Sequence, residues 1–118
     1  MKAREVMTAP VITIGPDAPF QKIVRVLIDY NVSALPVGSA EELKGIITDR
    51  DILYRLVAEG KDPRRTPVMQ IASKVVFSCR PEDNLNVAMD LMGSQNVRRL
   101  PVLDDAQRVI GWLTLSDL

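Results

Sequence analysis

The sequence predicts a mixed α/β fold built from two similar units in tandem, and an internal repeat is the main observation behind this prediction. Residues 31–37 return 65 positions later as residues 96–102, and both copies end in Leu-Pro-Val. Residues 45–51 return as residues 111–117, and both copies read Gly-x-x-Thr-x-x-Asp. Each half, at about 60 residues, would bury too little surface to be stable alone, so we expect the halves to share one core.

The first repeat has the pattern of a strand, a helix, a hairpin and a second helix. Runs of apolar and β-branched residues, bounded by Gly, Pro and Asp, mark the strands. Apolar residues spaced three and four apart, as from Phe20 to Ile28, mark the helices and predict a stripe that faces the core. In the first repeat, residues 1–60, we expect strands at 11–14, 34–37 and 43–48 and helices at 20–28 and 51–59.

A charged, proline-containing linker at residues 61–68 leads into the second repeat, residues 69–118. The same pattern predicts strands at 75–78, 100–102 and 109–114 and a helix at about 83–92. The last two residues would form only the first turn of a final helix. We therefore expect this chain to be a piece of a longer protein.

Composition narrows the classes of function. Fifteen basic and fifteen acidic residues leave no net charge, so the broad field that drives nonspecific nucleic-acid binding is missing. The chain has no histidine and one cysteine, Cys79, which removes histidine-based catalysis, the usual zinc ligand sets and an intrachain disulfide. No apolar run approaches the roughly 20 residues that span a bilayer, and the opening residues lack a signal-peptide core. We expect a soluble, cytoplasmic protein that is not an enzyme, holds no metal and binds neither nucleic acid nor membrane.

The Gly-x-x-Thr-x-x-Asp element has two interpretations. It places Thr48 and Asp51, and in the second copy Thr114 and Asp117, where a strand meets a helix. Free N–H groups at a helix start suit phosphate, and two carboxylate oxygens can accept both hydroxyls of a ribose. The same spacing is close to a capping box, in which the two side chains satisfy the helix end. On the pattern alone, we favour capping by about two to one.

The sequence resembles a tandem pair of CBS (cystathionine beta-synthase) domains, also called a Bateman module, over nearly its whole length. The resemblance rests on Val-Met-Thr at residues 6–8, on residues 32–37 and 97–102, and on the Gly-x-x-Thr-x-x-Asp element that closes each repeat. It implies βαββα units packed sheet against sheet, with two clefts that commonly hold adenosine nucleotides or related adenosyl ligands. Such modules usually regulate an attached or partner domain.

The resemblance also implies roles for individual residues. It assigns ribose recognition to Asp117 in one cleft and to Asp51 in the other. Thr114 and Thr48 would lie near the ribose or the phosphates of the respective ligands.

The two clefts are expected to differ in charge. In similar modules, the positions that face phosphate correspond to Arg98 and Arg99 in the Asp117 cleft and to Ser33 and Ala34 in the other. Because guanidinium groups suit phosphate oxygens, we expect a ligand with several phosphates to prefer the Asp117 cleft. The alternative is that both arginines are solvated, paired surface residues, which is the commoner fate of arginine.

The adenine is expected in an apolar slot that the opposite repeat contributes. Most of the residues proposed for it could equally be core residues. The slot residues are Thr8, Val11, Ile12 and Val32 for the Asp117 cleft, and Gln70, Val76, Phe77 and Val97 for the Asp51 cleft.

Two functions follow from these observations. The leading one is a regulatory module that senses AMP, ADP, ATP or a related adenosyl ligand, with AMP or ATP expected first and no cofactor required. The alternative is a ligand-independent homodimerisation module of a larger protein, in which the Thr-x-x-Asp elements are only caps. Apolar residues beside the main helix stripes, such as Val26 and Leu91, favour a homodimer under either interpretation.

Overall fold

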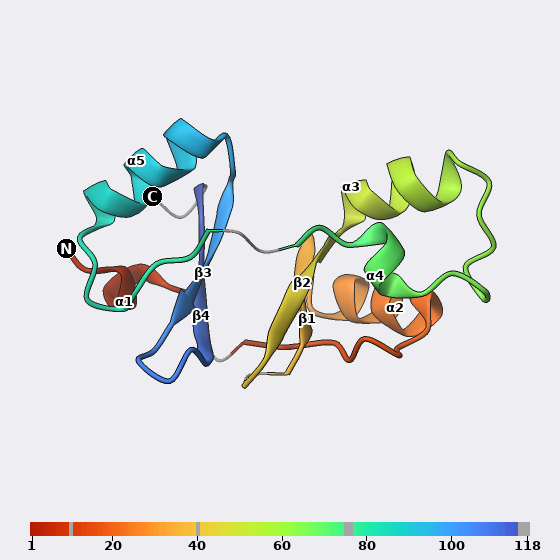
Figure 1. The fold of residues 1–118 in the computed structure, drawn as a ribbon, viewed down its shortest axis with the longest axis horizontal. Helices are drawn as coiled ribbons and strands as arrows, with labels where there is room; N and C mark the ends of the chain where they lie inside the picture. Colours follow the sequence, from red (N-terminus) through yellow and green to blue (C-terminus); the bar gives the residue numbers. More distant parts are fainter. Residues whose placement is uncertain (10, 40, 75–76, 116–118) are drawn as a thin grey trace. The chain divides into compact units, whose positions relative to one another are not determined.

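The chain folds into two compact units, drawn in Figure 1. The computed structural model describes residues 1–9, 11–39, 41–74 and 77–115. The first-repeat unit consists of Ile12–Ser39 and Leu43–Val75. The second-repeat unit joins the opening segment Met1–Val11 to Ala40–Glu42 and Val76–Leu118. The chain therefore begins in the unit that its second half builds.

The first-repeat unit contains the predicted hairpin. Its strands pair antiparallel with Leu35 opposite Ile47. The predicted helix at 51–59 begins earlier, because Thr48 caps it, and it continues as a π-helical segment. The elements are α2 (Phe20–Asp29), β1 (Ala34–Gly38), β2 (Leu43–Thr48), α3 (Asp49–Asp51), η1 (Ile52–Val57) and α4 (Val68–Ile71).

The second-repeat unit repeats this hairpin, with Leu100 opposite Leu113. Its long helix begins after Asn84, whose side chain accepts a hydrogen bond from the N–H of Asn86 at 2.9 Å. In Figure 1, α1 and the red opening segment lie beside the blue strands of this unit. The elements are α1 (Ala3–Val6), α5 (Leu85–Gln95), β3 (Arg99–Leu103) and β4 (Val109–Thr114).

The predicted first strand of each repeat is reduced to a single parallel bridge. Ile14 donates from its N–H to the carbonyl of Pro36 at 2.9 Å and accepts from Gly38 at 2.7 Å. Cys79 makes the equivalent bonds in the second repeat, donating to Pro101 at 3.0 Å and accepting from Leu103 at 2.9 Å. The strand predicted at 11–14 is therefore wrong in extent. The strand predicted at 75–78 is wrong in position, because the bridge falls on Cys79, and Phe77 and Ser78 form no strand. Residues 75 and 76 lie outside the described residues.

Both long helices end in the same way. Asn31, just after α2, and Asn96, just after α5, have positive φ angles of 51° and 53°. Asparagine is one of the few residues other than glycine that adopts this left-handed conformation readily. In each repeat this turn leads from the helix into the first strand of the hairpin. The two repeats are therefore alike in backbone conformation as well as in sequence.

Each unit has its own core cluster among the described residues. The predicted stripe of α2 buries Phe20, Ile23 and Leu27, whereas Ile28 is 60% exposed. The first-repeat cluster contains Ile14, Phe20, Ile23, Leu27, Leu35, Val37, Ile47, Ile52, Leu56, Val68, Ile71 and Ala72. The second-repeat cluster contains Ala3, Cys79, Ala88, Met92, Leu100, Val102 and Leu113.

The helices are short. The longest element of this kind, α5, has 11 residues, about half of what a bilayer-spanning helix needs. Over the described ranges, no helix is both long enough and apolar enough to cross a membrane.

Candidate functional site

Three residues predicted for one cleft meet where β3 begins and β4 ends. Thr114, the last residue of β4, lies opposite Arg99, the first residue of β3. Just beyond them, the N–H of Leu115 donates to the carbonyl of Arg98 at 2.8 Å. Arg98 is exposed, and Arg99 and Thr114 are half-buried. This end of the hairpin therefore carries two arginines and a threonine that solvent reaches.

Thr8 belongs to the same unit through the opening segment. Its N–H donates to the carbonyl of Trp112 at 2.9 Å, and its carbonyl accepts from the N–H of Trp112 at 3.0 Å. Opposite residues of an antiparallel pair, and alternate residues along a strand, point to the same face of a sheet. Thr8, Trp112 and Thr114 therefore share one face. The core residues Leu100 and Leu113 belong to the other face.

Two of the predicted site residues, Asp117 and Val76, lie outside the described residues. Val11 belongs to the second-repeat unit with Thr8, whereas Ile12 and Val32 belong to the first-repeat unit. The structure thus brings Thr8, Arg98, Arg99 and Thr114 into one unit.

In the first repeat, the Thr-x-x-Asp element forms a complete capping box. The N–H of Asp51 donates to Oγ1 of Thr48 at 3.0 Å, and the N–H of Thr48 donates to Oδ2 of Asp51 at 3.2 Å. Both groups are half-buried. The capping interpretation of this element is confirmed for Thr48 and Asp51, and it fixes the Asp51 carboxylate at the start of α3.

The expected equivalence between the two hairpin ends is confirmed. Asp49 donates from its N–H to the carbonyl of Ser33 at 3.0 Å, as Leu115 does to Arg98. Ala34 lies opposite Thr48, as Arg99 lies opposite Thr114. The first repeat therefore has a hydroxyl and a methyl group where the second has two guanidinium groups.

Gln70, predicted for the adenine slot of the Asp51 cleft, is not the residue of its segment that pairs with β2. It lies exposed on α4, and Ser73 makes the contacts that would match those of Thr8. The N–H of Ser73 donates to Ile46 at 2.9 Å, and the N–H of Ile46 donates to Ser73 at 2.8 Å. Ser73 therefore takes the place in its segment that Thr8 takes in the opening one, because α4, like α1, forms a complete helical turn before the paired residue.

The described apolar residues predicted for the Asp51 cleft, Phe77 and Val97, belong to the second-repeat unit. Phe77 and Val97 are half-buried and pack against the core cluster of that unit. Their contacts are those of core-flanking residues, which was the alternative that the sequence left open.

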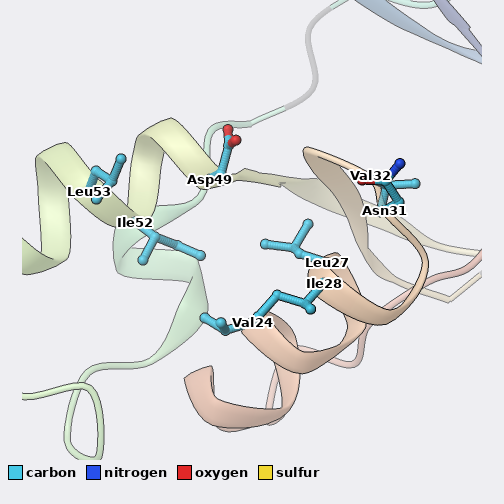
Figure 2. A pocket seen from close by; sticks show the side chains of 8 residues that line it. All are labelled: Val24, Leu27, Ile28, Asn31, Val32, Asp49, Ile52 and Leu53. Carbon is cyan, nitrogen blue, oxygen red and sulfur yellow. The ribbon is translucent and has the colours of Figure 1, made fainter.

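A groove that sequence inspection missed runs between α2 and the α3–η1 helix. It has a volume of about 510 Å³. Figure 2 shows Leu27 of α2 and Ile52 of η1 pointing toward each other across it. Its remaining lining residues are Val24, Ile28, Asn31, Val32, Asp49 and Leu53.

The apolar surface around this groove differs from the one that the sequence predicted. Val26 and Leu91 are half-buried against the two cores rather than exposed. The large exposed apolar side chains on α2, on η1 and just beyond α2 are Ile28, Tyr30, Val32, Leu53, Tyr54 and Val57. No stretch of sequence shows this surface, because two helices contribute to it.

Comparison with known proteins identifies the family. A family model described as the CBS domain matches residues 3–58 and again residues 68–118. The chain is 36% identical over 115 residues to CBS domain-containing protein YhcV of Bacillus subtilis, which covers 98% of this chain and 81% of that protein. Other relatives carry the matching region as a small part of an enzyme.

Solved structures show the same fold. The CBS domain pair of protein MJ0100, in complex with 5′-methylthioadenosine and S-adenosyl-L-methionine, has a TM-score of 0.86 at 25% identity, covering 99% of this chain and 91% of that one. The CBS domain protein PAE2072 from Pyrobaculum aerophilum, complexed with AMP, has a TM-score of 0.88 at 24% identity. The match covers 100% of this chain and 90% of that one. One further structural relative is a hexamer. Two matches to the family model, two equivalent hairpins and two equivalent helix ends together place this chain in the CBS-domain family, as a tandem CBS pair or Bateman module.

Proposed function

We propose that this CBS pair is a regulatory module that binds an adenosine nucleotide or a related adenosyl ligand and passes its occupancy to a partner or attached domain. The observation that carries the proposal is the end of the β3–β4 hairpin, where Arg98, Arg99 and Thr114 lie together. A relative of the same fold was solved with two adenosyl compounds, which supports this class of ligand.

The chemistry of this hairpin end suits a phosphorylated ligand. Guanidinium groups remain charged at any physiological pH and donate several hydrogen bonds to phosphate oxygens. The hydroxyl of Thr114 adds a donor, and Asp117 is proposed to accept the ribose hydroxyls. AMP and ATP are the first candidates, with ATP favoured by the two arginines.

The equivalent end of the first repeat suits a less charged ligand. Ser33 and Ala34 offer no cation there, and the Asp51 carboxylate caps α3 through one oxygen, Oδ2. A carboxylate oxygen that accepts one N–H retains lone pairs, so capping and ribose recognition are compatible. We propose that this second site binds an adenosyl group without several phosphates or stays empty.

Regulation requires that the ligand bind two conformations with different affinity, since equal affinity would shift no population. The module acts by such a shift rather than by chemistry on the nucleotide. A CBS pair of this kind therefore requires no catalytic residue, metal or cofactor, and the nucleotide is its regulatory ligand.

Calorimetry with AMP, ADP, ATP, S-adenosylmethionine, NADH and GTP tests the proposal. We expect binding confined to adenosyl ligands. Asp117→Asn should weaken it by at least about 10-fold, as the loss of hydrogen bonds to a charged group predicts. Asp90→Asn, an exposed change on α5, is the matched control and should have no effect. No binding at millimolar ligand, or equal binding by both variants, would contradict the proposal.

The groove of the first-repeat unit favours a second candidate, a ligand-independent homodimerisation module of a larger protein. Three large apolar side chains beside the groove are 57–61% exposed: Ile28, Leu53 and Val57. Because burying such side chains is favourable, contact with a second copy of this surface would stabilise a dimer. Leu53→Glu should then convert a dimer to a monomer in sedimentation equilibrium. Val87→Glu, equally exposed on α5, is the control. A wild-type chain that is monomeric at high micromolar concentration would exclude this candidate.

A further inference from the structure

The opening segment, residues 1–9, packs in the second-repeat unit although it is far in sequence from the rest of that unit. Its backbone is bonded at both ends. The N–H of Ala3 donates to the carbonyl of Asp83 at 2.8 Å, and the carbonyl of Met1 accepts from Leu85 at 2.9 Å. At the other end, Thr8 exchanges its two hydrogen bonds with Trp112. Figure 1 shows the segment and α1 beside β4.

The first-repeat unit contains an equivalent segment, residues 67–74, which provides an internal comparison. Its helix α4 matches α1, and Ser73 pairs with Ile46 as Thr8 pairs with Trp112. The two segments make the same pair of backbone hydrogen bonds to their sheets. The opening segment is also bonded through its backbone to residues 81–85, by the N–H groups of Ala3 and Arg4 and the carbonyl of Met1. The segments differ further in their side chains.

The side chains of the two segments are buried to different extents. Segment 67–74 inserts Val68 and Ile71, 1% and 0% exposed, into the first core. In the opening segment, the residue at the position of Val68 is Ala3, which is also fully buried but is the smallest apolar side chain. Val6, at the position of Ile71, is only half-buried. At these two positions the opening segment removes less apolar surface from water, although Met7, half-buried at the position of Ala72, offsets part of the difference.

Ion pairs take the place of this apolar burial. Nζ of Lys2 lies 2.8 Å from Oε2 of Glu82, and a guanidinium nitrogen of Arg4 lies 2.9 Å from Oε1 of the same residue. All three side chains are about half exposed, at 48%, 53% and 56%. Ion pairs this exposed contribute little to stability, and salt screens them.

We propose that the opening segment is a detachable strap. It leaves β4 while the rest of the second-repeat unit remains folded, whereas segment 67–74 leaves its sheet only when the first-repeat unit unfolds. Local opening of this kind occurs where few apolar groups are buried and polar contacts are exposed. Release carries Thr8 away from the face of the sheet that bears Thr114, and it exposes the backbone edge of β4.

Amide hydrogen exchange of the whole chain, followed by NMR, tests the strap residue by residue. Thr8 and Trp112 donate to each other across the strap contact, and Ser73 and Ile46 do so across the matched contact. Each pair has a reference inside its own unit: Cys79 and Leu103 for the strap, and Ile14 and Gly38 for the other segment. These references remove any difference in global stability between the units.

We expect the protection of Thr8 and Trp112 to be at least 10-fold lower than that of Cys79 and Leu103. Ser73 and Ile46 should be protected as well as Ile14 and Gly38. In 1 M NaCl, only the Thr8 and Trp112 protection should fall further. Equal protection of Thr8, Trp112, Cys79 and Leu103 would overturn the proposal, because the strap would then open only with its unit.

Glu82→Gln provides the second test, since it removes the partner of both Lys2 and Arg4. It should accelerate exchange at Thr8 and Trp112 several-fold and leave Cys79 unchanged. Asp29→Asn removes an equally exposed ion pair with Arg25 in the other unit, and it should change none of these amides. A Glu82→Gln chain with unaltered exchange at Thr8 would show that the ion pairs do not hold the strap.

Discussion

Gly111 on β4 is packed directly against Met7 of the opening segment. A Cβ atom at position 111 would lie 2.5 Å from the sulfur of Met7 and 3.1 Å from the carbonyl oxygen of Thr8. Its counterpart Gly45 faces a less adaptable neighbour, since a Cβ there would lie 2.7 Å from the carbonyl oxygen of Ser73. Both hairpins therefore need glycine where an incoming segment crosses the strand.

The two glycines should differ in their tolerance of alanine. Gly45→Ala pushes against backbone and should cost about 2–3 kcal/mol, within the range for overpacked sites. Gly111→Ala pushes mainly against a flexible methionine and should cost about 1 kcal/mol. Urea unfolding followed by circular dichroism measures both. Gly93→Ala is the control, because nothing lies within 4 Å of that position on α5, and it should stabilise the helix.

The left-handed turn after α5 should tolerate glycine but not alanine. Asn96 has a φ of 53°, where a Cβ costs roughly 1–2 kcal/mol unless the residue is asparagine or aspartate. We expect Asn96→Ala to lower the free energy of unfolding by about 1 kcal/mol and Asn96→Gly to leave it unchanged or raise it. The same pair of changes at Asn31 should reproduce the result. An Asn96→Ala chain as stable as the wild type would contradict the assignment of strain.

The thiol of Cys79 should make stability fall in alkaline solution. Burial, and then the negative charge of Asp83, raise its pKa from 9.0 to about 11. Between these values the unfolded chain loses the thiol proton and the native chain keeps it, so unfolding becomes more favourable as pH rises from 9 to 11. Below pH 9 the thiol is protonated in both states, so its ionisation adds no pH dependence to the stability. Native Cys79 should also react slowly with thiol reagents at pH 8.

The comparison that isolates this effect is with Cys79→Ala. Every other titratable group is present in both proteins, so its contribution cancels in the comparison. The difference in unfolding free energy between wild type and variant should therefore shrink between pH 9 and 11. A constant difference across that range would show that the thiol does not titrate as proposed.

The preference for phosphates should depend on the arginine pair at the β3–β4 end. Under the proposed function, Arg98→Ala with Arg99→Ala should weaken ATP binding about 10- to 100-fold, as expected for lost charged hydrogen bonds. Adenosine binding should change little. Arg64→Ala with Arg65→Ala removes the same charge from the first-repeat unit and is the control. Calorimetry measures both affinities. If the Arg98 and Arg99 double variant keeps the wild-type preference for ATP over adenosine, as the control does, these arginines do not recognise phosphate.

The hairpins could be predicted from sequence because their information is local. A Leu-Pro-Val run, a turn and a Gly-containing apolar run define each pair of strands without reference to the rest of the chain. The cap formed by Thr48 and Asp51 could also be read from a four-residue spacing. These features depend on neighbours a few positions apart, and the structure contains them where the pattern predicts them.

Features that depend on distant residues could not be read in this way. Ile28 fits the core stripe of α2, yet it borders a groove that only η1 completes. The pairing of Ser73 with Ile46, which matches that of Thr8 with Trp112, could not be read either, because backbone pairing rather than side-chain identity fixes the position. The ligand class came only from the resemblance to CBS pairs. The spacing of the Thr-x-x-Asp element alone favours a helix cap and indicates no ligand.

The divided second-repeat unit has a consequence for the order of folding. The first-repeat unit consists of residues 12–39 and 43–75 and can close as soon as these have been synthesised. The strap emerges before all of them but has no sheet to join until residues 77–115 follow, several seconds later at about 5–20 residues per second. During synthesis, the strap thus emerges ahead of residues 12–75 but docks only after them. A cut between the two repeats in the linker would leave the strap attached to the wrong half.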